Sequence, residues 1–476
     1  MLKIFGGRAP DHPMADARAA RRILEELPAQ DAKALEELVH WHESVAAAEG
    51  FKLAPRFQLI ALIDEAAQPR LRKLARDYFA AERPSRFQEA QMWGRIHSYW
   101  QQTAQAYGQC VESSLKGEDV GKAALPLLAV RALRSLAQQL KWLHLRYGPV
   151  DPAVWGRLNR VYAFAELHGI TEAKVGLYPG VPGESTPRLE FLRALLFGAA
   201  SPDSLLPSEI ELAERLIAEL APDCALGMAP SAGMPFWTDL ALAMAPQRAL
   251  TAPPQTKGLR CFGPGGAAPA LQAMIARSRE PEVDVLRHLA ACWAREPRQR
   301  QHPRHNVKTR LTIAHGFEGV LEALGGGDSL NFDRRAAESW IVENVSHGGF
   351  GALVPQMKGD WIRVGELLAL QPDGGDNWLV GTVRRVNRVS QQEARVGIQT
   401  LSKSPSVSSF QLSGMGAKSG VLLDDGAIAL PAGVYVQGLN LEAERAGRQH
   451  VYMPQGVAQR GADYEIVRFR EMIRES

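Results

Sequence analysis

Cysteine is scarce in this sequence of 476 residues, which has four: Cys110, Cys224, Cys261 and Cys292. None belongs to a CxxC pair, and the four lie far apart in the sequence. This dispersal argues against a disulfide framework and against a structural zinc site, and we expect no metal site. Four isolated thiols suit a reducing cytoplasm.

An excess of one charge sign is also missing. Lysine and arginine total 55 and acidic residues 52, so the formal net charge is +3. Such a balance produces no global field of the kind that coats nucleic acid or membranes. Any binding of nucleic acid or other anions would therefore depend on local basic clusters.

Long apolar runs are absent as well. A transmembrane helix needs about 20 consecutive apolar residues, and no segment has that length. The opening "MLKIFGGRAPDHP" places glycine, arginine and proline where a signal peptide would need an apolar core. We expect a cytoplasmic protein without membrane insertion.

Familiar catalytic motifs are missing. The sequence contains no GxSxG elbow and no GxxxxGK[ST] phosphate loop. His40 and His42 are two residues apart, not the four that a zinc-binding helix needs. Gly263, Gly265 and Ala268 fit GxGxxA, but a proline within the motif, another after it and the lack of a second βαβ unit favour a simple turn. We expect a protein that is not an enzyme and has no cofactor.

The first half of the chain has the pattern of helices. Trp93, Ile96, Trp100 and Tyr107 recur at steps of three and four residues within a segment of good helix formers. Residues 1–225 are therefore predicted as a helical domain. Residues 226–295 are rich in Gly, Pro and Met and are predicted as a connector that contains helices.

The second half has the pattern of strands. Short runs rich in Val, Ile and Leu alternate with Gly, Asp and Asn, as in "WIVENV", "FGALVP" and "WLVGTVRRVNRV". This spacing predicts a small β-barrel over residues 296–404 and, after a Ser-rich break, a small C-terminal β module over residues 405–476. The expected fold class is multidomain α+β, with a large all-α N-terminal region.

One segment is strongly basic: "REPRQRQHPRHNVKTR", residues 295–310, has one acidic residue. Its arginines include Arg298, Arg300 and Arg304. A planar guanidinium matches both phosphate oxygens and the O6/N7 edge of guanine. The alternative is a solvated linker, and the RxxxR spacing of Arg300 and Arg304 recurs elsewhere in the chain.

A second motif, "NVSHGG" at residues 344–349, is the only [DN]xSxxG in the sequence. Asn344 supplies an amide and Ser346 a hydroxyl, whereas Gly349 has no Cβ and permits close approach to the backbone. A plain turn between two strands would need only a glycine.

An RxxxR loop followed by a strand and [DN]xSxxG in a small β domain resembles the PilZ domain, a bacterial receptor for cyclic di-GMP. The resemblance covers about residues 296–404 and implies a six-stranded antiparallel barrel. It implies that Arg300 and Arg304 grip guanine edges and phosphates, and that Asn344 and Ser346 contact guanine and phosphate. Gly349 would leave room for the ligand, and the further candidates are Arg298, Gly348 and His347.

About forty residues separate Arg304 from Asn344. They include residues 316–338, which read as an extra helix and loop and leave the path of the arginine loop open.

The leading hypothesis is a cyclic di-GMP effector in which the ligand orders the Arg-rich loop and signals to a helical output region. That region would contact a protein partner, with outputs in motility, pili, attachment or exopolysaccharide production, and DNA is not expected as a partner. Two alternatives stay open: a degenerate PilZ scaffold for protein interaction without ligand, and a single-stranded nucleic-acid-binding barrel with a basic arm.

Overall fold

The computed structural model describes residues 10–80, 85–296, 302–325, 338–412, 416–445 and 447–474. The chain divides into two compact units. The helical unit comprises Met1–Arg146, Val150–Pro202 and Pro207–Arg298, and the barrel unit comprises Tyr147–Pro149, Asp203–Leu206 and Gln299–Ser476.

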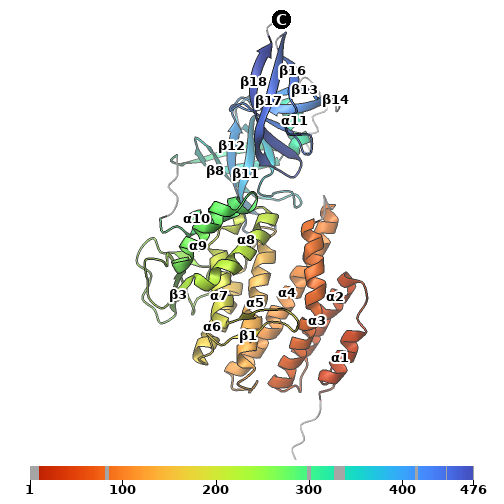
Figure 1. Ribbon diagram of the computed structural model, residues 1–476, viewed down its shortest axis with the longest axis vertical. Coiled ribbons are helices and arrows are strands. Elements are labelled where there is room, and N and C mark those ends of the chain that lie inside the picture. Colours follow the sequence, from red (N-terminus) through yellow and green to blue (C-terminus); the bar gives the residue numbers. More distant parts are fainter. Residues whose placement is uncertain are drawn as a thin grey trace, which may run out of the picture. The chain divides into compact units, whose positions relative to one another are not determined.

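The helical unit confirms the predicted all-α N-terminal region. Helices that follow one another in the chain pack together, as Figure 1 shows for the long helices from the red to the yellow part of the ribbon. Its helices are α1 (Ala17–Glu25), α2 (Asp31–Ala47), α3 (Leu53–Ala80), α4 (Arg86–Leu115), α5 (Leu125–His144), α6 (Pro152–Leu167), α7 (Pro187–Gly198), α8 (Pro207–Leu220), α9 (Ala268–Arg277) and α10 (Glu282–Trp293).

Helix α4 illustrates why these segments are helical. Ser85 and Gln88 form a reciprocal capping box at its start, which satisfies amide groups that no helical bond can reach. The predicted apolar stripe lies in the core, with Ile96, Trp100 and Tyr107 all buried.

A buried carboxylate lies within this helical core. Asp64 of α3 accepts hydrogen bonds from the hydroxyls of Tyr99 and Tyr107, each at 2.9 Å, and from Gln68 Nε2 at 2.8 Å. These donors offset the cost of removing its oxygens from water.

The Gly- and Pro-rich connector contains a small sheet as well as α9 and α10. Its strand order is β3 (Ala225–Gly227), β6 (Leu259–Gly263), β4 (Phe236–Asp239) and β5 (Gln247–Arg248). A Cβ on Gly263 would lie 2.4 Å from Pro235 Cδ, and one on Gly265 would lie 2.7 Å from the Ala225 side chain. These glycines allow a tight turn against neighbouring strands. Two further short strands, β1 (Val175–Gly176) and β2 (Glu184–Ser185), pair with each other.

The first half of the barrel unit is the predicted six-stranded antiparallel barrel, in the order β10-β11-β12-β9-β8-β7. Alternate residues fill its interior, among them Leu311, Trp340, Val354 and Val383, all fully buried. The strands are β7 (His305–His315), β8 (Glu338–Ser346), β9 (Gly349–Val354), β10 (Leu367–Pro372), β11 (Leu379–Arg388) and β12 (Ala394–Ser402).

The C-terminal β module is itself a closed antiparallel barrel, in the order β13-β14-β15-β18-β17-β16. Sequence patterning indicated strands here without showing that they close, because closure depends on pairings between distant segments. The strands are β13 (Ser406–Leu412), β14 (Gly416–Leu422), β15 (Ala427–Pro431), β16 (Leu441–Arg445), β17 (Arg448–Arg460) and β18 (Tyr464–Arg474).

The extra helix of the predicted insertion is α11 (Gly316–Leu324), which directly follows β7. Its Phe317 and Val320 are buried in a cluster with Leu367 of the first barrel and with Ala429 and Tyr464 of the second. Helix α11 therefore belongs to a core shared by the two barrels. Residues 326–337, the rest of the insertion, lie outside the described ranges.

Candidate functional site

The "NVSHGG" motif forms the hairpin between β8 and β9. Ser346 pairs with Gly349 across a two-residue turn, and its hydroxyl lies 3.4 Å from the Gly349 carbonyl oxygen. Gly349 has a φ of 155°, and a Cβ there would lie 2.0 Å from the carbonyl oxygen of Ile398 on β12. Glycine is needed at this position because the backbone of the next strand approaches so closely.

Asn344 is placed by a β-bulge. Val342 pairs with Ala352 but Asn344 pairs with Gly351, so Glu343 is the extra residue of β8. The Asn344 amide lies over Gly351, where a Cβ would be 2.7 Å from Oδ1 and 2.6 Å from Nδ2. Asn344 Oδ1 is buried and has no hydrogen-bond partner among the described residues. A buried acceptor without a donor is costly, and a ligand that supplies the donor removes that cost.

A second bulge arranges two consecutive arginines on β11. Val383 pairs with Ile398 and Arg385 with Gly397, so that both Arg384 and Arg385 are exposed on the outer face of the barrel. Arg384 Nε donates to Gln399 Oε1 at 2.6 Å, and Arg385 Nε lies 2.5 Å from Asp203 Oδ2.

These groups line one pocket of about 640 Å³ on the outer face of the first barrel. Among the described residues, its wall contains four arginines and a single carboxylate, that of Glu343, which lies 3.6 Å from Arg395. Such a surface favours an anionic ligand. The lining residues are His302, Arg304, Glu343, Asn344, Ser346, Gly348, Gly349, Phe350, Gly351, Ala352, Arg384, Arg385, Asn387, Arg395, Val396, Gly397, Ile398 and Gln399.

Most of the site residues predicted from sequence come together here. Arg304, Asn344, Ser346, Gly348 and Gly349 all line the pocket. The structure thus brings the residue before β7 to the hairpin, although α11 and the rest of the insertion lie between them in the chain.

The other three predicted site residues are not among the described residues that line the pocket. His347 is exposed at the tip of the hairpin, with its ring centroid 5.0 Å from that of His302, and it does not line the pocket. Arg298 and Arg300 lie outside the described residues.

The sequence reasoning missed Arg384, Arg385, Arg395 and Gly351. The signal available was the basic pattern of "VRRVNRV", residues 383–389, in a predicted strand. Whether these arginines face the pocket depends on the bulge at Arg384 and on the pairing of β12 with both β11 and β9. A single sequence shows neither feature.

Neither a metal site nor a membrane-spanning helix occurs within the described ranges. No group of three or more His, Cys, Asp or Glu side chains there could hold a metal ion. No helix in the same ranges has the length and apolarity to cross a membrane.

Two parts of the chain match known family models. Residues 18–231 match the model described as "Cyclic-di-GMP receptor FimW, N-terminal domain". Residues 331–406 match the one described as "Cyclic-di-GMP receptor FimW, middle PilZ domain". The second match spans β8 to β12 and so includes the hairpin with Asn344 and Ser346. No curated protein matches the chain. The two matches confirm the resemblance seen in the sequence: the chain belongs to the PilZ-domain family of cyclic-di-GMP receptors, as a multidomain protein with a helical N-terminal region.

Proposed function

We propose that this protein is a cyclic di-GMP effector and that the pocket on the first barrel binds the ligand. The observation that carries the proposal is the convergence of the polar hairpin, the described end of the Arg-rich segment and three barrel arginines on one pocket. Cyclic di-GMP has two guanines and two phosphates, and this lining offers partners for both kinds of group.

The hairpin residues have the chemistry for guanine and phosphate. Asn344 Oδ1, buried without a partner in the described part of the chain, accepts from the N–H groups on the guanine edge. The Ser346 hydroxyl donates to a phosphate oxygen. Gly348 and Gly349 keep the turn narrow, which leaves the ligand access to the hairpin backbone.

The arginines complete the site. Arg304 contacts guanine O6/N7 or phosphate through its planar fork. Arg384, Arg385 and Arg395 hold phosphate from the barrel face, where Arg385 exchanges Asp203 for the ligand. Arg298 and Arg300 join them from the loop as the ligand orders the Arg-rich segment on the barrel.

The proposed role of this site is to bind the ligand and not to catalyse a reaction on it. A ligand that prefers the ordered loop shifts the population of conformations and requires no chemical step, so no enzyme activity and no cofactor are proposed. The helical unit receives the change and contacts a protein partner that acts in motility, pili, attachment or exopolysaccharide production. DNA is not a proposed partner.

Isothermal titration calorimetry of the full chain with cyclic di-GMP tests the proposal. We expect binding in the micromolar range or tighter. Arg304→Ala removes one charge-assisted contact, which is worth about 1.5–3 kcal/mol, and should weaken binding at least about tenfold. Arg310→Ala is the matched control, because Arg310 belongs to the same basic segment but does not line the pocket.

Two results would overturn the proposal. The first is the absence of binding heat at modest salt, which favours a scaffold without ligand. The second is a tight, salt-dependent affinity for single-stranded oligonucleotides that cyclic di-GMP does not displace.

A further inference from the structure

The helical unit contains a pocket of its own, of about 590 Å³, lined by residues of α3, α4, α5 and α8. One face of α3 forms its longest wall, from Gln68 to Ala80. Side chains at steps of three and four residues along α3 share this face. The volume lies within the usual range of about 300–1,000 Å³ for small-molecule sites.

The apolar part of the lining is recessed. Ile96, Trp100 and Trp142 are 1%, 6% and 1% exposed, respectively. None of the large hydrophobic side chains that are exposed in the described chain lines this pocket. A surface for docking a protein would present exposed apolar side chains, so the recessed lining favours a small molecule over a protein partner.

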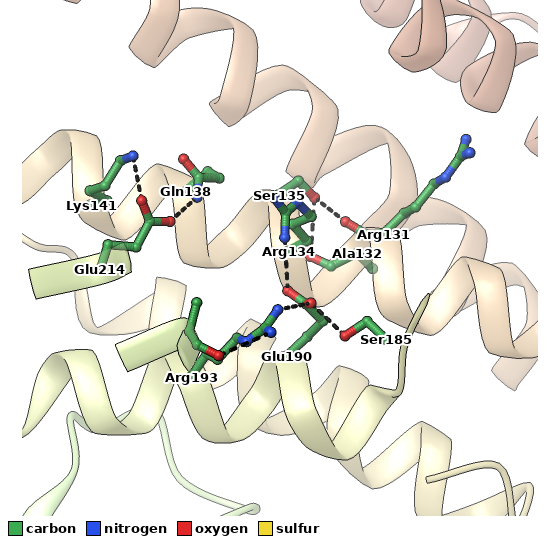
Figure 2. Close-up of polar contacts among 11 residues, drawn as sticks. Arg131, Ala132, Arg134, Ser135, Gln138, Lys141, Ser185, Glu190, Arg193 and Glu214 are labelled. Carbon is green, nitrogen blue, oxygen red and sulfur yellow. Dashed lines mark hydrogen bonds and ion pairs between the residues drawn. The ribbon is translucent and has the colours of Figure 1, made fainter. Parts of the chain in front are cut away.

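The inner wall contains charges that are already balanced. Figure 2 shows Lys141 and Gln138 of α5 directed at Glu214 of α8. Lys141 Nζ lies 2.6 Å from Glu214 Oε2 and 2.8 Å from Glu211 Oε2. Burial opposes ionisation, but the attraction of Lys141 holds the pKa of Glu214 below its usual value, so the pair stays charged.

Arg134 is also balanced, in a separate group of contacts around Glu190 that Figure 2 shows. It lies 3.6 Å from the buried Glu190, which also accepts from Ser185 Oγ and from Arg193. Lys141 and Arg134, the two α5 cations of this pocket, therefore already have carboxylate partners and require no external anion.

Arg72 and Arg76 differ from these cations. Both are exposed, both line the pocket from α3, and neither forms an ion pair with any residue in the described ranges. They are one helical turn apart, with Cβ atoms about 5–6 Å from each other, so both guanidinium groups can reach one anionic group. The small side chain of Ala75 leaves space between them and the aromatic wall.

We propose that this pocket binds an organic anion, with its carboxylate or phosphate held by Arg72 and Arg76 and its apolar, ring-sized body against Ala75, Phe79 and Trp100. The ligand class follows from the combination of two arginines without carboxylate partners among the described residues and a recessed aromatic wall. The site is separate in residues and chemistry from the barrel pocket.

A fluorescence titration of the full chain with 8-anilinonaphthalene-1-sulfonate tests this proposal, because the probe joins an anionic group to an aromatic body. We expect micromolar binding that phenyl phosphate displaces and inorganic phosphate does not. Arg72→Gln combined with Arg76→Gln should weaken the probe about tenfold or more. Arg215→Gln, an exposed arginine of α8 outside the pocket, is the control and should change nothing.

A second variant checks the apolar half of the site. Ala75→Trp fills the space beside Phe79 and should abolish the same signal, and an unchanged near-ultraviolet circular dichroism spectrum shows that the fold is retained. Probe binding that survives the arginine replacements but not Ala75→Trp would overturn the anion assignment in favour of an apolar docking groove. Probe binding equal in all variants would overturn the site altogether. Cyclic di-GMP affinity should be unchanged throughout, which separates this test from that of the barrel pocket.

Discussion

Replacing Asn344 with alanine should change stability and ligand affinity in opposite directions. In the free protein, Asn344 Oδ1 is buried without a hydrogen bond to any described residue. An unsatisfied buried polar group costs about 1–3 kcal/mol, and alanine removes it. The loss of packing is small because Asn344 is only half-buried. The variant should therefore be as stable as the wild type or up to about 1 kcal/mol more stable.

Ligand affinity should fall, because the guanine N–H groups that donate to Asn344 Oδ1 would be left without an acceptor. A buried donor without an acceptor again costs about 1–3 kcal/mol, which corresponds to about fivefold or more in the dissociation constant. Asn306→Ala is the matched control. Asn306 is the exposed cross-strand neighbour of Asn344 on β7 and does not line the pocket.

Differential scanning calorimetry with and without cyclic di-GMP measures both effects in the full chain. The unfolding transition that moves on addition of the ligand is assigned to the barrel unit. In Asn344→Ala, we expect the midpoint of this transition in the free protein to be unchanged or up to about 3 °C higher. The increase in midpoint caused by the ligand should be smaller than in the wild type. The reasoning fails if the variant loses more than about 1 kcal/mol of stability while its ligand shift stays the same. That outcome would make the amide a structural group.

Three further predictions concern other parts of the chain. Gly351→Ala places a Cβ 2.7 Å from Asn344 Oδ1, so it should displace the amide and weaken cyclic di-GMP binding at least about fivefold by calorimetry; unchanged affinity would contradict the placement of Asn344. Asp203→Asn frees Arg385 from an ion pair worth about 0.2–1 kcal/mol and should raise affinity up to about fivefold, whereas a lower affinity would show that Asp203 positions the arginine. His42 is fully buried, neither of its ring nitrogens has a hydrogen-bond partner in the described chain, and burial lowers its pKa to about 3. Because this pKa lies below the unfolded value of about 6.5, its stability contribution is complete above pH 6.5 and is lost toward pH 3 at about 1.4 kcal/mol per unit. His42→Leu should therefore reduce the loss of unfolding free energy between pH 7 and pH 5 by about 2 kcal/mol, and an identical pH dependence in both proteins would refute this account.

The sequence predicted the architecture well where local pattern decides it. Steps of three and four residues around Trp100 indicated helices, and the runs "WIVENV" and "FGALVP" indicated the strands that the hairpin joins. An extra helix was also expected within residues 316–338, and the structure contains one there, Gly316–Leu324. Its place in a core common to both barrels could not be expected, because Phe317 contacts residues more than a hundred positions away.

The candidate site divides in the same way. The sequence by itself determined the polar hairpin and the basic segment, because each is a short run of residues with its own chemistry. Only the tertiary structure decided that Arg304, Asn344 and Arg385 line the same pocket. The physical reason is that two β-bulges and the pairing of β12 with β9 and β11 bring these side chains to the same face of the barrel. Such pairings depend on contacts between distant segments rather than on local pattern.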